Sequence, residues 1–309
     1  MRLRPRKRKG VMRLLLTFIR YRLTAMVAAS ALAGYLLHPW NPGASGAVVL
    51  TSGVFLLAAG GSALNQVQER TTDALMARTR HRPLPAGLLS PRAGLAVSLA
   101  LFASALALLL TTGPVPTVLG VFAIVWYNGV YTPLKKITPW ALLPGALCGA
   151  LPPMLGWTAA GGALFDYRIV LLAGIFFLWQ IPHFWLLARR CRCDYRRAGL
   201  PTVARLFTPR QARRITFAWI LALAVGTCWF LAIGPLRQDA AKFLCATSGG
   251  WAIVCAAAGR RRKTAVSWEL LLGRPEPFIA IFVTALLLDG LLSVGAPLLL
   301  AMLRAASIG

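Results

Sequence analysis

Acidic residues are scarce in this chain. Its 309 residues include only 8 Asp and Glu against 34 Lys and Arg, and charged residues of both signs make up 14% of the whole. Hydrophobic residues make up 58%, and the mean hydropathy is +0.66. A soluble domain of this composition would expose far too much apolar surface to water. The shortage of charge therefore excludes a soluble protein and predicts an all-α membrane protein with several spans.

Paired cysteines are lacking as well, and so is any nucleic-acid motif. The six cysteines contain no C-x-x-C pair, so we expect free thiols and not a disulfide framework. The net charge of +26 would suit a nucleic acid, but an excess of Lys and Arg on the cytoplasmic side of a membrane explains it. We therefore expect no nucleic-acid partner, and we expect the basic residues to attract anionic membrane lipids.

Nine apolar runs approach the length of about 20 residues that crosses a bilayer as a helix. They cover residues 23–37, 47–65, 93–112, 117–132, 139–158, 168–188, 215–234, 243–258 and 278–303. If the N-terminus is cytoplasmic, 30 of the 34 Lys and Arg fall in cytoplasmic segments, which agrees with the positive-inside rule. The pattern predicts a multi-pass protein of the cytoplasmic (inner) membrane, with its C-terminus on the opposite side.

The apolar runs also divide the chain. We expect a basic cytoplasmic tail at 1–22, a single polytopic domain at 23–303 and a short C-terminal tail at 304–309. Two long basic loops, 66–92 and 189–214, each follow an even-numbered span. Both begin with polar residues that we expect to continue a helix past the apolar zone, over 65–82 and over 180–197. We expect the two loops to face each other over one cavity that opens to the cytoplasm.

Three oxygen-bearing side chains recur at every fourth position where the first loop begins. Because residues four apart lie on one face of a helix, Asn65, Glu69 and Asp73 would form a single stripe. Magnesium takes one or two carboxylates and accepts its other ligands from waters and substrate phosphates. The stripe therefore predicts a magnesium and diphosphate site. The simpler alternative is that Glu69 pairs with Arg70 and that Asp73 pairs with Arg78.

Basic residues in three cytoplasmic segments would supply the positive charge that a diphosphate requires. We expect five of them to contact diphosphate oxygens, namely Arg78, Arg82, Lys135, Lys136 and Arg190. The alternative is that these residues only fix the orientation of the chain in the membrane.

The first loop resembles the first signature of the UbiA superfamily of intramembrane prenyltransferases, through the residues Asn65-x3-Glu69-x3-Asp73-x2-Met76-x-Arg78-Thr79-x2-Arg82-Pro83-Leu84. Five later segments resemble the protoheme IX farnesyltransferase (heme O synthase) branch of that superfamily. They are Tyr131-Thr132-Pro133-Leu134-Lys135-Lys136, Pro144-Gly145-Ala146, Pro152-Pro153-x2-Gly156-Trp157, Trp179-Gln180-x-Pro182-His183-Phe184 and Asp194-Tyr195-x2-Ala198-Gly199-x-Pro201. The similarity extends over about residues 20 to 290, and its motifs are specific as a set.

This resemblance implies nine transmembrane helices around a central cavity. It also implies a reaction that uses Mg²⁺ and moves a farnesyl group from farnesyl diphosphate to a vinyl group of heme B, giving heme O and diphosphate. The product would serve heme A and cytochrome oxidase cofactor biosynthesis. Heme A synthase or oxidase assembly factors are the protein partners that such a role implies.

The resemblance assigns the metal and diphosphate ligands to Asn65, Glu69, Asp73 and Asp194. Three of the departures from the superfamily pattern bear on these ligands. Glu69 stands where Asp is commoner, Thr71 replaces a frequent acid, and Arg190 lies four residues before Asp194 where the wider superfamily has an aspartate. These departures leave the number of metal ions open.

His183 is the candidate for binding the heme acceptor. It follows Pro182, which removes an amide donor and can kink the helix so that the imidazole is directed inward. Imidazole is a suitable axial ligand for heme iron. The alternative is a buried histidine that is hydrogen-bonded to a neighbouring helix.

Two other functions stay open. A prenyltransferase for an aromatic acid or a quinone precursor would use the same diphosphate site, although the segment around His183 and the missing second aspartate pair argue against it. A non-catalytic membrane transporter or assembly protein is the alternative from another class. Metal-dependent release of diphosphate would separate an enzyme from the latter.

Overall fold

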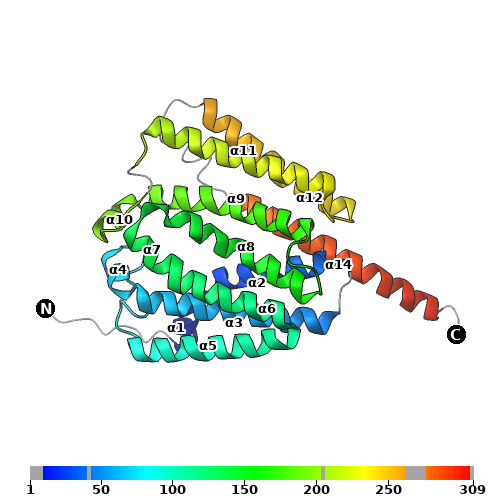
Figure 1. Ribbon diagram of the computed structural model, residues 1–309, viewed down its shortest axis with the longest axis horizontal. Helices are drawn as coiled ribbons and strands as arrows, with labels where there is room; N and C mark the ends of the chain where they lie inside the picture. Colours follow the sequence, from blue (N-terminus) through cyan, green and yellow to red (C-terminus); the bar gives the residue numbers. More distant parts are fainter. Residues whose placement is uncertain (1–9, 40–42, 203–205, 262–275, 307–309) are drawn as a thin grey trace.

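The computed structural model describes residues 10–39, 43–202, 206–261 and 276–306. Within these ranges the chain is helical and contains no strand (Figure 1). The elements are α1 Val11–Phe18, α2 Tyr21–Leu37, α3 Ala44–Gln68, α4 Arg70–Leu75, α5 Pro91–Thr112, α6 Pro114–Ile124, the π-helix η1 Val125–Tyr131, α7 Thr132–Ile137, the 3-10 helix η2 Pro139–Ala141, α8 Leu142–Ala159, α9 Tyr167–Arg190, α10 Arg192–Arg197, α11 Pro209–Ile233, α12 Asp239–Arg261 and α14 Glu276–Ala306.

Capping residues explain where several of these helices begin. The Ser90 side chain accepts a hydrogen bond from the Ala93 amide, and Pro91 occupies the first turn of α5. At α11, Thr208 and Gln211 form a reciprocal capping box. Both arrangements satisfy amide groups that the first turn of a helix leaves without partners. The long helices therefore start at signals that lie in the sequence itself.

The helices cover each of the nine predicted apolar runs to within a few residues. By length and composition, six described helical stretches are able to cross a membrane: Ala44–Gln68, Pro91–Thr112, Pro114–Ile137, Tyr167–Arg190, Arg210–Ile233 and Glu276–Ser293. α1 and α2 form a pair bent by 54°, which would make a seventh if it is one span. A multi-pass membrane protein follows, while the number of nine spans and the side of the N-terminus stay predictions.

The long helices pack in a closed ring in which sequence neighbours are also spatial neighbours. Contacts run from α2 to α3, α5, α6, α8, α9, α11, α12 and α14, and α14 returns to α2. α2 also packs directly on α8, because Gly34 and Gly156 allow each backbone to approach the other. An added Cβ at Gly34 would collide with the carbonyl of Pro153. Large apolar side chains on the outside of α5, α6, α11 and α12 are exposed, as expected for surfaces that face lipid.

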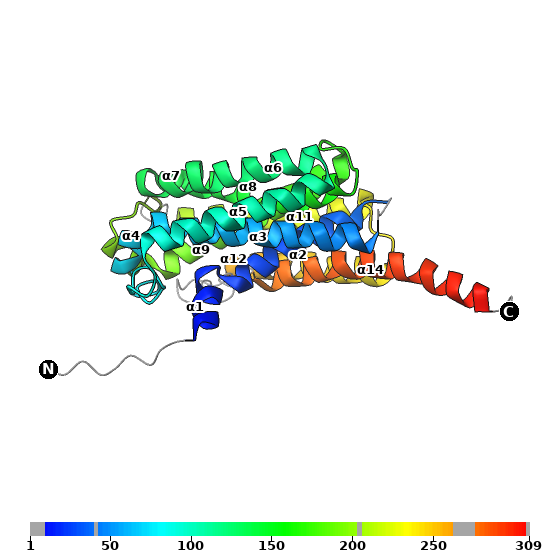
Figure 2. The ribbon, with the colours of Figure 1, turned by 90° about the horizontal axis from the view of Figure 1, so that it is seen from below.

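The ends of the chain differ from the predicted tails. Residues 11–18 of the expected tail form α1, which projects from one side of the bundle (Figure 2), whereas residues 1–9 lie outside the described part. α14 continues to Ala306, so it includes part of the expected C-terminal tail. It extends past the end of the bundle opposite to α4 and α10 (Figure 1).

The two predicted helix extensions are wrong in detail. α3 ends at Gln68, α4 covers only Arg70–Leu75, and turns follow it up to residue 89. The break lies at Glu69, whose backbone dihedrals are φ −102° and ψ 9°, and the carbonyl of Glu69 accepts from both the Thr72 hydroxyl and the Asp73 amide. In the second loop the helix breaks at Cys191, between α9 and α10.

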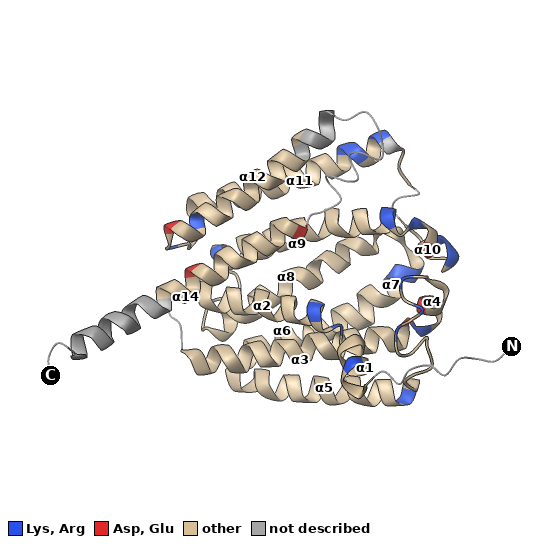
Figure 3. Cartoon of the chain, turned by 180° about the vertical axis from the view of Figure 1, so that it is seen from behind, with Lys and Arg blue, Asp and Glu red and all other residues tan. Residues whose placement is uncertain are grey.

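α4, α7 and α10 lie at one end of the bundle, where Lys and Arg gather (Figure 3).

Candidate active site

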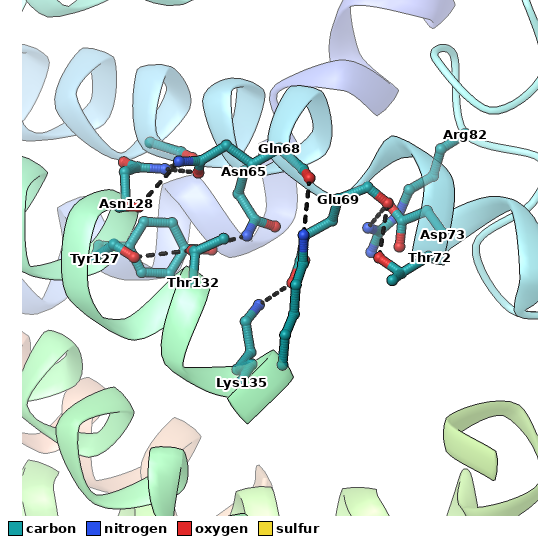
Figure 4. Close-up of polar contacts among 12 residues, drawn as sticks. Asn65, Gln68, Glu69, Thr72, Asp73, Arg82, Tyr127, Asn128, Thr132 and Lys135 are labelled. Carbon is teal, nitrogen blue, oxygen red and sulfur yellow. Dashed lines mark hydrogen bonds and ion pairs between the residues drawn. The ribbon is translucent and has the colours of Figure 1, made fainter. Parts of the chain in front are cut away.

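Asn65 lies buried in the last turn of α3, close to the start of α7. Its Nδ2 donates to Oγ1 of Thr132 at 3.0 Å, and that hydroxyl donates in turn to the carbonyl of Tyr127 at 2.9 Å. Both side chains are almost inaccessible, at 2% and 1%. The amide nitrogen is thus held by α7, and the amide oxygen lies on the side of Glu69 (Figure 4). This arrangement leaves Asn65 an oxygen that is suited to a metal ion.

The predicted spacing of Asn65, Glu69 and Asp73 is kept although the helix is interrupted between them. The Glu69 amide donates to the Asn65 carbonyl at 2.9 Å, and the Asp73 amide donates to the Glu69 carbonyl at 2.7 Å. Both bonds have the i to i−4 pattern of an α-helix. The three side chains consequently lie in a row at the end of α3 and along α4 (Figure 4).

Each carboxylate of this row pairs with a cation from a distant segment. Lys135 Nζ lies 2.7 Å from Oε1 of Glu69, and Arg82 Nη1 lies 2.7 Å from Oδ2 of Asp73. The alternative that Glu69 pairs with Arg70 and that Asp73 pairs with Arg78 is therefore wrong. Arg70 instead donates to the carbonyl of Val67. Burial lowers the pKa of Arg82, and the charge of Asp73 raises it. Charges of opposite sign are therefore concentrated and partly desolvated here.

α7 supplies both predicted lysines. Lys135 Nζ also lies 4.8 Å from the ring centroid of Tyr131, within the range of a cation–π contact. Lys136 Nζ donates to the Gln68 carbonyl at 3.3 Å, which places it at the C-terminal end of α3. A cation at that position interacts favourably with the helix dipole. The two lysines thus contact consecutive residues, Glu69 and Gln68, at the C-terminal end of α3.

A buried polar network next to these residues was not predicted from the sequence. Asn128 Nδ2 donates to the Gly61 carbonyl at 3.1 Å and to Gln68 Oε1 at 3.2 Å, while Gln68 Nε2 donates to the Asn128 carbonyl at 3.0 Å. Asn128 belongs to η1, and π-helical segments frequently mark functional sites. An asparagine inside an otherwise apolar run was the only signal available. The network fixes η1, and with it α7, against α3.

Asp194 joins the second loop to the first. Its Oδ1 accepts from the Ala77 amide at 3.0 Å, and its Oδ2 accepts from the Arg78 amide at 3.2 Å. This contact brings the two loops together, as expected, while a cavity between them stays a prediction. Both carboxylate oxygens are bonded to amides, so the role of Asp194 as a metal ligand stays a prediction. The same bonds place the Arg78 backbone beside α10.

The residues of the row fit magnesium by their chemistry. Within the described part of the chain, no three His, Cys, Asp or Glu side chains are grouped closely enough to hold a metal ion. Magnesium needs only one or two carboxylates when waters and phosphate oxygens complete its shell. Asn65, Glu69 and Asp73 offer one amide and two carboxylates, which is such a partial set. A phosphate-bearing substrate would have to supply the remainder.

His183 and Arg190 belong to a second cluster, formed between α9 and α14. His183 Nδ1 lies 3.8 Å and Arg190 Nη1 lies 4.0 Å from the same oxygen of Glu276, Oε1. The imidazole stacks on Trp179, with ring centroids 4.8 Å apart. Arg190 was expected to contact diphosphate, yet its described ion pair is with Glu276 and not with the row on α3 and α4. Glu276 was missed because it lies about 90 residues from its partners in the sequence.

Aromatic rings connect the two clusters. Tyr131 lies beneath Lys135 and faces Phe184 at a centroid distance of 6.2 Å. Phe184 lies 5.7 Å from His183. Rings from η1 and α9 therefore extend without interruption from the cationic end of α7 to the imidazole. Such a row is apolar and could accommodate a hydrocarbon chain or a planar macrocycle.

A model of the UbiA prenyltransferase family matches residues 23–282. The chain belongs to the UbiA prenyltransferase family. It is therefore a membrane-embedded prenyltransferase by family, and the resemblance seen in its motifs is confirmed. The matched range includes both clusters of the site and every site residue that the sequence had suggested.

Individual UbiA family members are similar in sequence or in fold. Protoheme IX farnesyltransferase of Geobacter sulfurreducens is 50% identical over 235 residues, which are 75% of this chain and 85% of the relative. The protein of the same name from Nitratidesulfovibrio vulgaris (strain DP4) is 38% identical over 252 residues, 80% of this chain and 87% of the relative. These relatives extend over most of both chains.

Solved structures of the family share the fold at low sequence identity. A UbiA homolog from Aeropyrum pernix K1 has a TM-score of 0.70 at 20% identity, over 92% of this chain and 99% of that one. A UbiA homolog from Archaeoglobus fulgidus, bound to GPP and Mg²⁺, has a TM-score of 0.66 at 17% identity, over 89% of this chain and 99% of that one. The ring of helices is thus the UbiA fold.

Proposed function

We propose that this chain transfers a farnesyl group from farnesyl diphosphate to a vinyl group of heme B, releasing diphosphate and giving heme O. The observation that carries this proposal is the 50% identity over 235 residues with a protoheme IX farnesyltransferase. At such identity over most of both chains, a common reaction is the simplest expectation. The solved UbiA homolog that binds GPP and Mg²⁺ supports the same class of donor and metal.

The donor end of the site is assigned to the row on α3 and α4. Asn65, Glu69 and Asp73 would hold Mg²⁺, with Asp194 as a further ligand from α10. When bound, Mg²⁺ would neutralise the oxygens of the leaving diphosphate. The basic residues proposed to bind the remaining diphosphate oxygens are Arg78, Arg82, Lys135 and Lys136. Arg190 is not among them, because its described ion pair is with Glu276.

The ion pairs of Glu69 and Asp73 suggest how the site accommodates a diphosphate. Lys135 and Arg82 neutralise the two carboxylates at 2.7 Å each, and buried carboxylates need such partners. With a metal ion held by Glu69 and Asp73, Lys135 and Arg82 would be free to contact phosphate oxygens. Each carboxylate would then keep a positive partner, which keeps the desolvation cost of the bound state low.

The reaction that follows is a heterolytic cleavage. The allylic C–O bond breaks, the electron pair leaves with the diphosphate, and the vinyl carbon of the acceptor attacks C1 of the farnesyl group. Water adds at the resulting cation, and loss of a proton gives the hydroxyethyl linkage. The rings of Tyr131 and Phe184 supply an apolar wall beside Lys135, and their faces carry the negative charge density that a carbocation prefers.

His183 is proposed to bind the acceptor through the heme iron. The location proposed for the enzyme is the cytoplasmic membrane with the site facing the cytoplasm, because the basic residues gather at the end that carries α4, α7 and α10 (Figure 3). Association with heme A synthase or oxidase assembly factors is proposed on the chemistry of the product alone, since a hydrophobic heme would need a receiving protein.

Product analysis tests the proposal. Purified protein in lipid nanodiscs is incubated with Mg²⁺, farnesyl diphosphate and either heme B or 4-hydroxybenzoate, and products are identified by mass. We expect farnesylated heme carrying one added water, and no farnesylated benzoate. The matched control is Glu69→Gln, which keeps the size of the side chain but removes its charge and should abolish turnover.

Three outcomes would contradict the proposal. Farnesylated benzoate without a heme product would identify an aromatic-acid prenyltransferase. Release of diphosphate with neither acceptor, in the presence of Mg²⁺, would point to another acceptor, and no release at all would favour a non-catalytic membrane protein.

A further inference from the structure

Glu276, Arg190 and His183 form a cluster that is separate from the row proposed to bind farnesyl diphosphate. We propose that this cluster is the acceptor-binding site for a metalloporphyrin carrying carboxylates. In it Glu276 is a positioning residue, His183 binds the metal and Arg190 binds a propionate. The inference deepens the proposed function and rests on it, and it moves Arg190 from the diphosphate to the acceptor.

The imidazole of His183 has a carboxylate beside one of its two nitrogens. Nδ1 is buried and has no hydrogen-bond partner among the residues that the structure describes, although a carboxylate oxygen of Glu276 lies 3.8 Å away. A metal-binding histidine almost always donates its second ring nitrogen to a carboxylate or carbonyl, which fixes the tautomer and the ring plane. Here Glu276 faces Nδ1, so Nε2 is the nitrogen left for the metal. Stacking on Trp179 at an interplanar angle of 21° restricts the ring further.

The guanidinium of Arg190 is available to a carboxylate of the acceptor. Arg190 follows His183 by seven residues, or about two turns, on α9, so both side chains project from one face of that helix. The Arg190 side chain is 45% exposed and lies 4.0 Å from Glu276. Its five donors allow it to keep this carboxylate and still bind a second one. A porphyrin propionate is a carboxylate of the required kind.

The combination of groups at this cluster favours one class of ligand. An aromatic acid or a diphosphate would use Arg190 but would leave the imidazole without a function. A metal with a planar, apolar, carboxylate-bearing ligand uses all three residues. The aromatic row from Phe184 to Tyr131 begins at this imidazole and leads towards Lys135. A macrocycle bound by His183 would therefore lie on the side of the donor.

Binding titrations without farnesyl diphosphate test the site independently of turnover. Heme B and metal-free protoporphyrin are titrated into the full-length protein in nanodiscs, and absorption spectra report the iron ligand. We expect Glu276→Gln to raise the Kd for heme about tenfold, as loss of an outer carboxylate typically does. The Kd for metal-free protoporphyrin should stay unchanged, because it has no metal for His183 to bind. Asp239→Asn, which removes an exposed acid elsewhere, is the matched control and should change neither value.

A second ligand pair tests Arg190. The wild-type protein should bind heme more tightly than heme dimethyl ester, whereas Arg190→Gln should bind both alike. In the turnover assay, Glu276→Gln should raise the KM for heme and leave the KM for farnesyl diphosphate unchanged. An equal rise of both KM values, an equal loss of heme and metal-free porphyrin binding, or an undiminished preference for free propionates in Arg190→Gln would overturn the inference.

The titrations also separate the two proposals. Wild-type protein that binds heme with this dependence but makes no heme O would refute the proposed function and leave the acceptor site in place. Wild-type protein that makes heme O while Glu276→Gln behaves normally would refute the acceptor site alone.

Discussion

Removing Asp73 should damage the protein in two ways that a second substitution separates. Its carboxylate is 1% exposed and lies 2.7 Å from a guanidinium nitrogen of Arg82, whose side chain is 13% exposed. In Asp73→Ala the guanidinium stays buried without a partner, and breaking a buried pair in this way costs about 3–5 kcal/mol. At 1.4 kcal/mol per tenfold change, the folding equilibrium constant would fall by a factor of roughly 100 to 4,000. Turnover should be lost as well, since a metal ligand is gone.

The double variant Asp73→Ala/Arg82→Ala removes the stranded charge together with its partner. Replacing both members of a buried pair is often close to neutral for stability, so we expect the thermal midpoint to return most of the way to that of the wild-type protein. Turnover should remain absent, because the double variant lacks both a metal ligand and a diphosphate contact. Thermal unfolding followed by tryptophan fluorescence in detergent measures the first quantity, and product mass measures the second.

Two results would refute this reasoning. If Asp73→Ala unfolds at the wild-type temperature, the charge of Arg82 does not depend on Asp73. If the double variant recovers turnover along with stability, Asp73 serves only to balance Arg82, and the metal site lies elsewhere.

Three further predictions concern Lys135, Asp289 and magnesium. Lys135→Met should raise the KM for farnesyl diphosphate about tenfold or more through loss of a charged contact, while Lys135→Arg keeps part of it; an unchanged KM in both would exclude a diphosphate contact. Asp289→Ala should destabilise the protein by about 3 kcal/mol, because one carboxylate oxygen accepts the Arg237 and Gln238 amides at 2.7 Å each. Asp289→Asn keeps an oxygen there and should be milder, with turnover per folded molecule unchanged in both variants; equal destabilisation would mean that the oxygen is not the cause. Chelation of Mg²⁺ should stop diphosphate release without changing heme binding, and release in excess EDTA would contradict a metal-dependent donor site.

The sequence was sufficient for the parts of the structure that depend on local pattern. Apolar run length located the helices, and the four-residue spacing located the row from Asn65 to Asp73, because both are properties of neighbouring residues. The helix break at Glu69 was missed, because a change of backbone dihedrals at one residue, to φ −102° and ψ 9°, leaves the four-residue spacing of the polar side chains unchanged.

Contacts between residues that are distant in the sequence could not be predicted either. Lys135 lies 66 residues from Glu69, and Glu276 lies 93 residues from His183, so only the packing of the ring brings each pair together. With one chain and its local periodicity, a basic residue can be assigned to the cytoplasmic end of a bundle but not to a particular carboxylate. The motif resemblance narrowed the choice for the donor residues, and it gave no reason to consider Glu276.

The π-helix η1 makes the number of residues in this span as important as their identity. Its seven residues, Val125–Tyr131, precede α7 directly, and each residue of a helix turns the chain by about 100°. Deletion of a single residue from η1, for instance Gly129, would rotate the following turn by that angle and carry Lys135 away from Glu69, even though every ligand of the site remained in the sequence. Among relatives that share all the motifs, a one-residue gap in this segment would therefore mark an enzyme whose donor site has been rearranged.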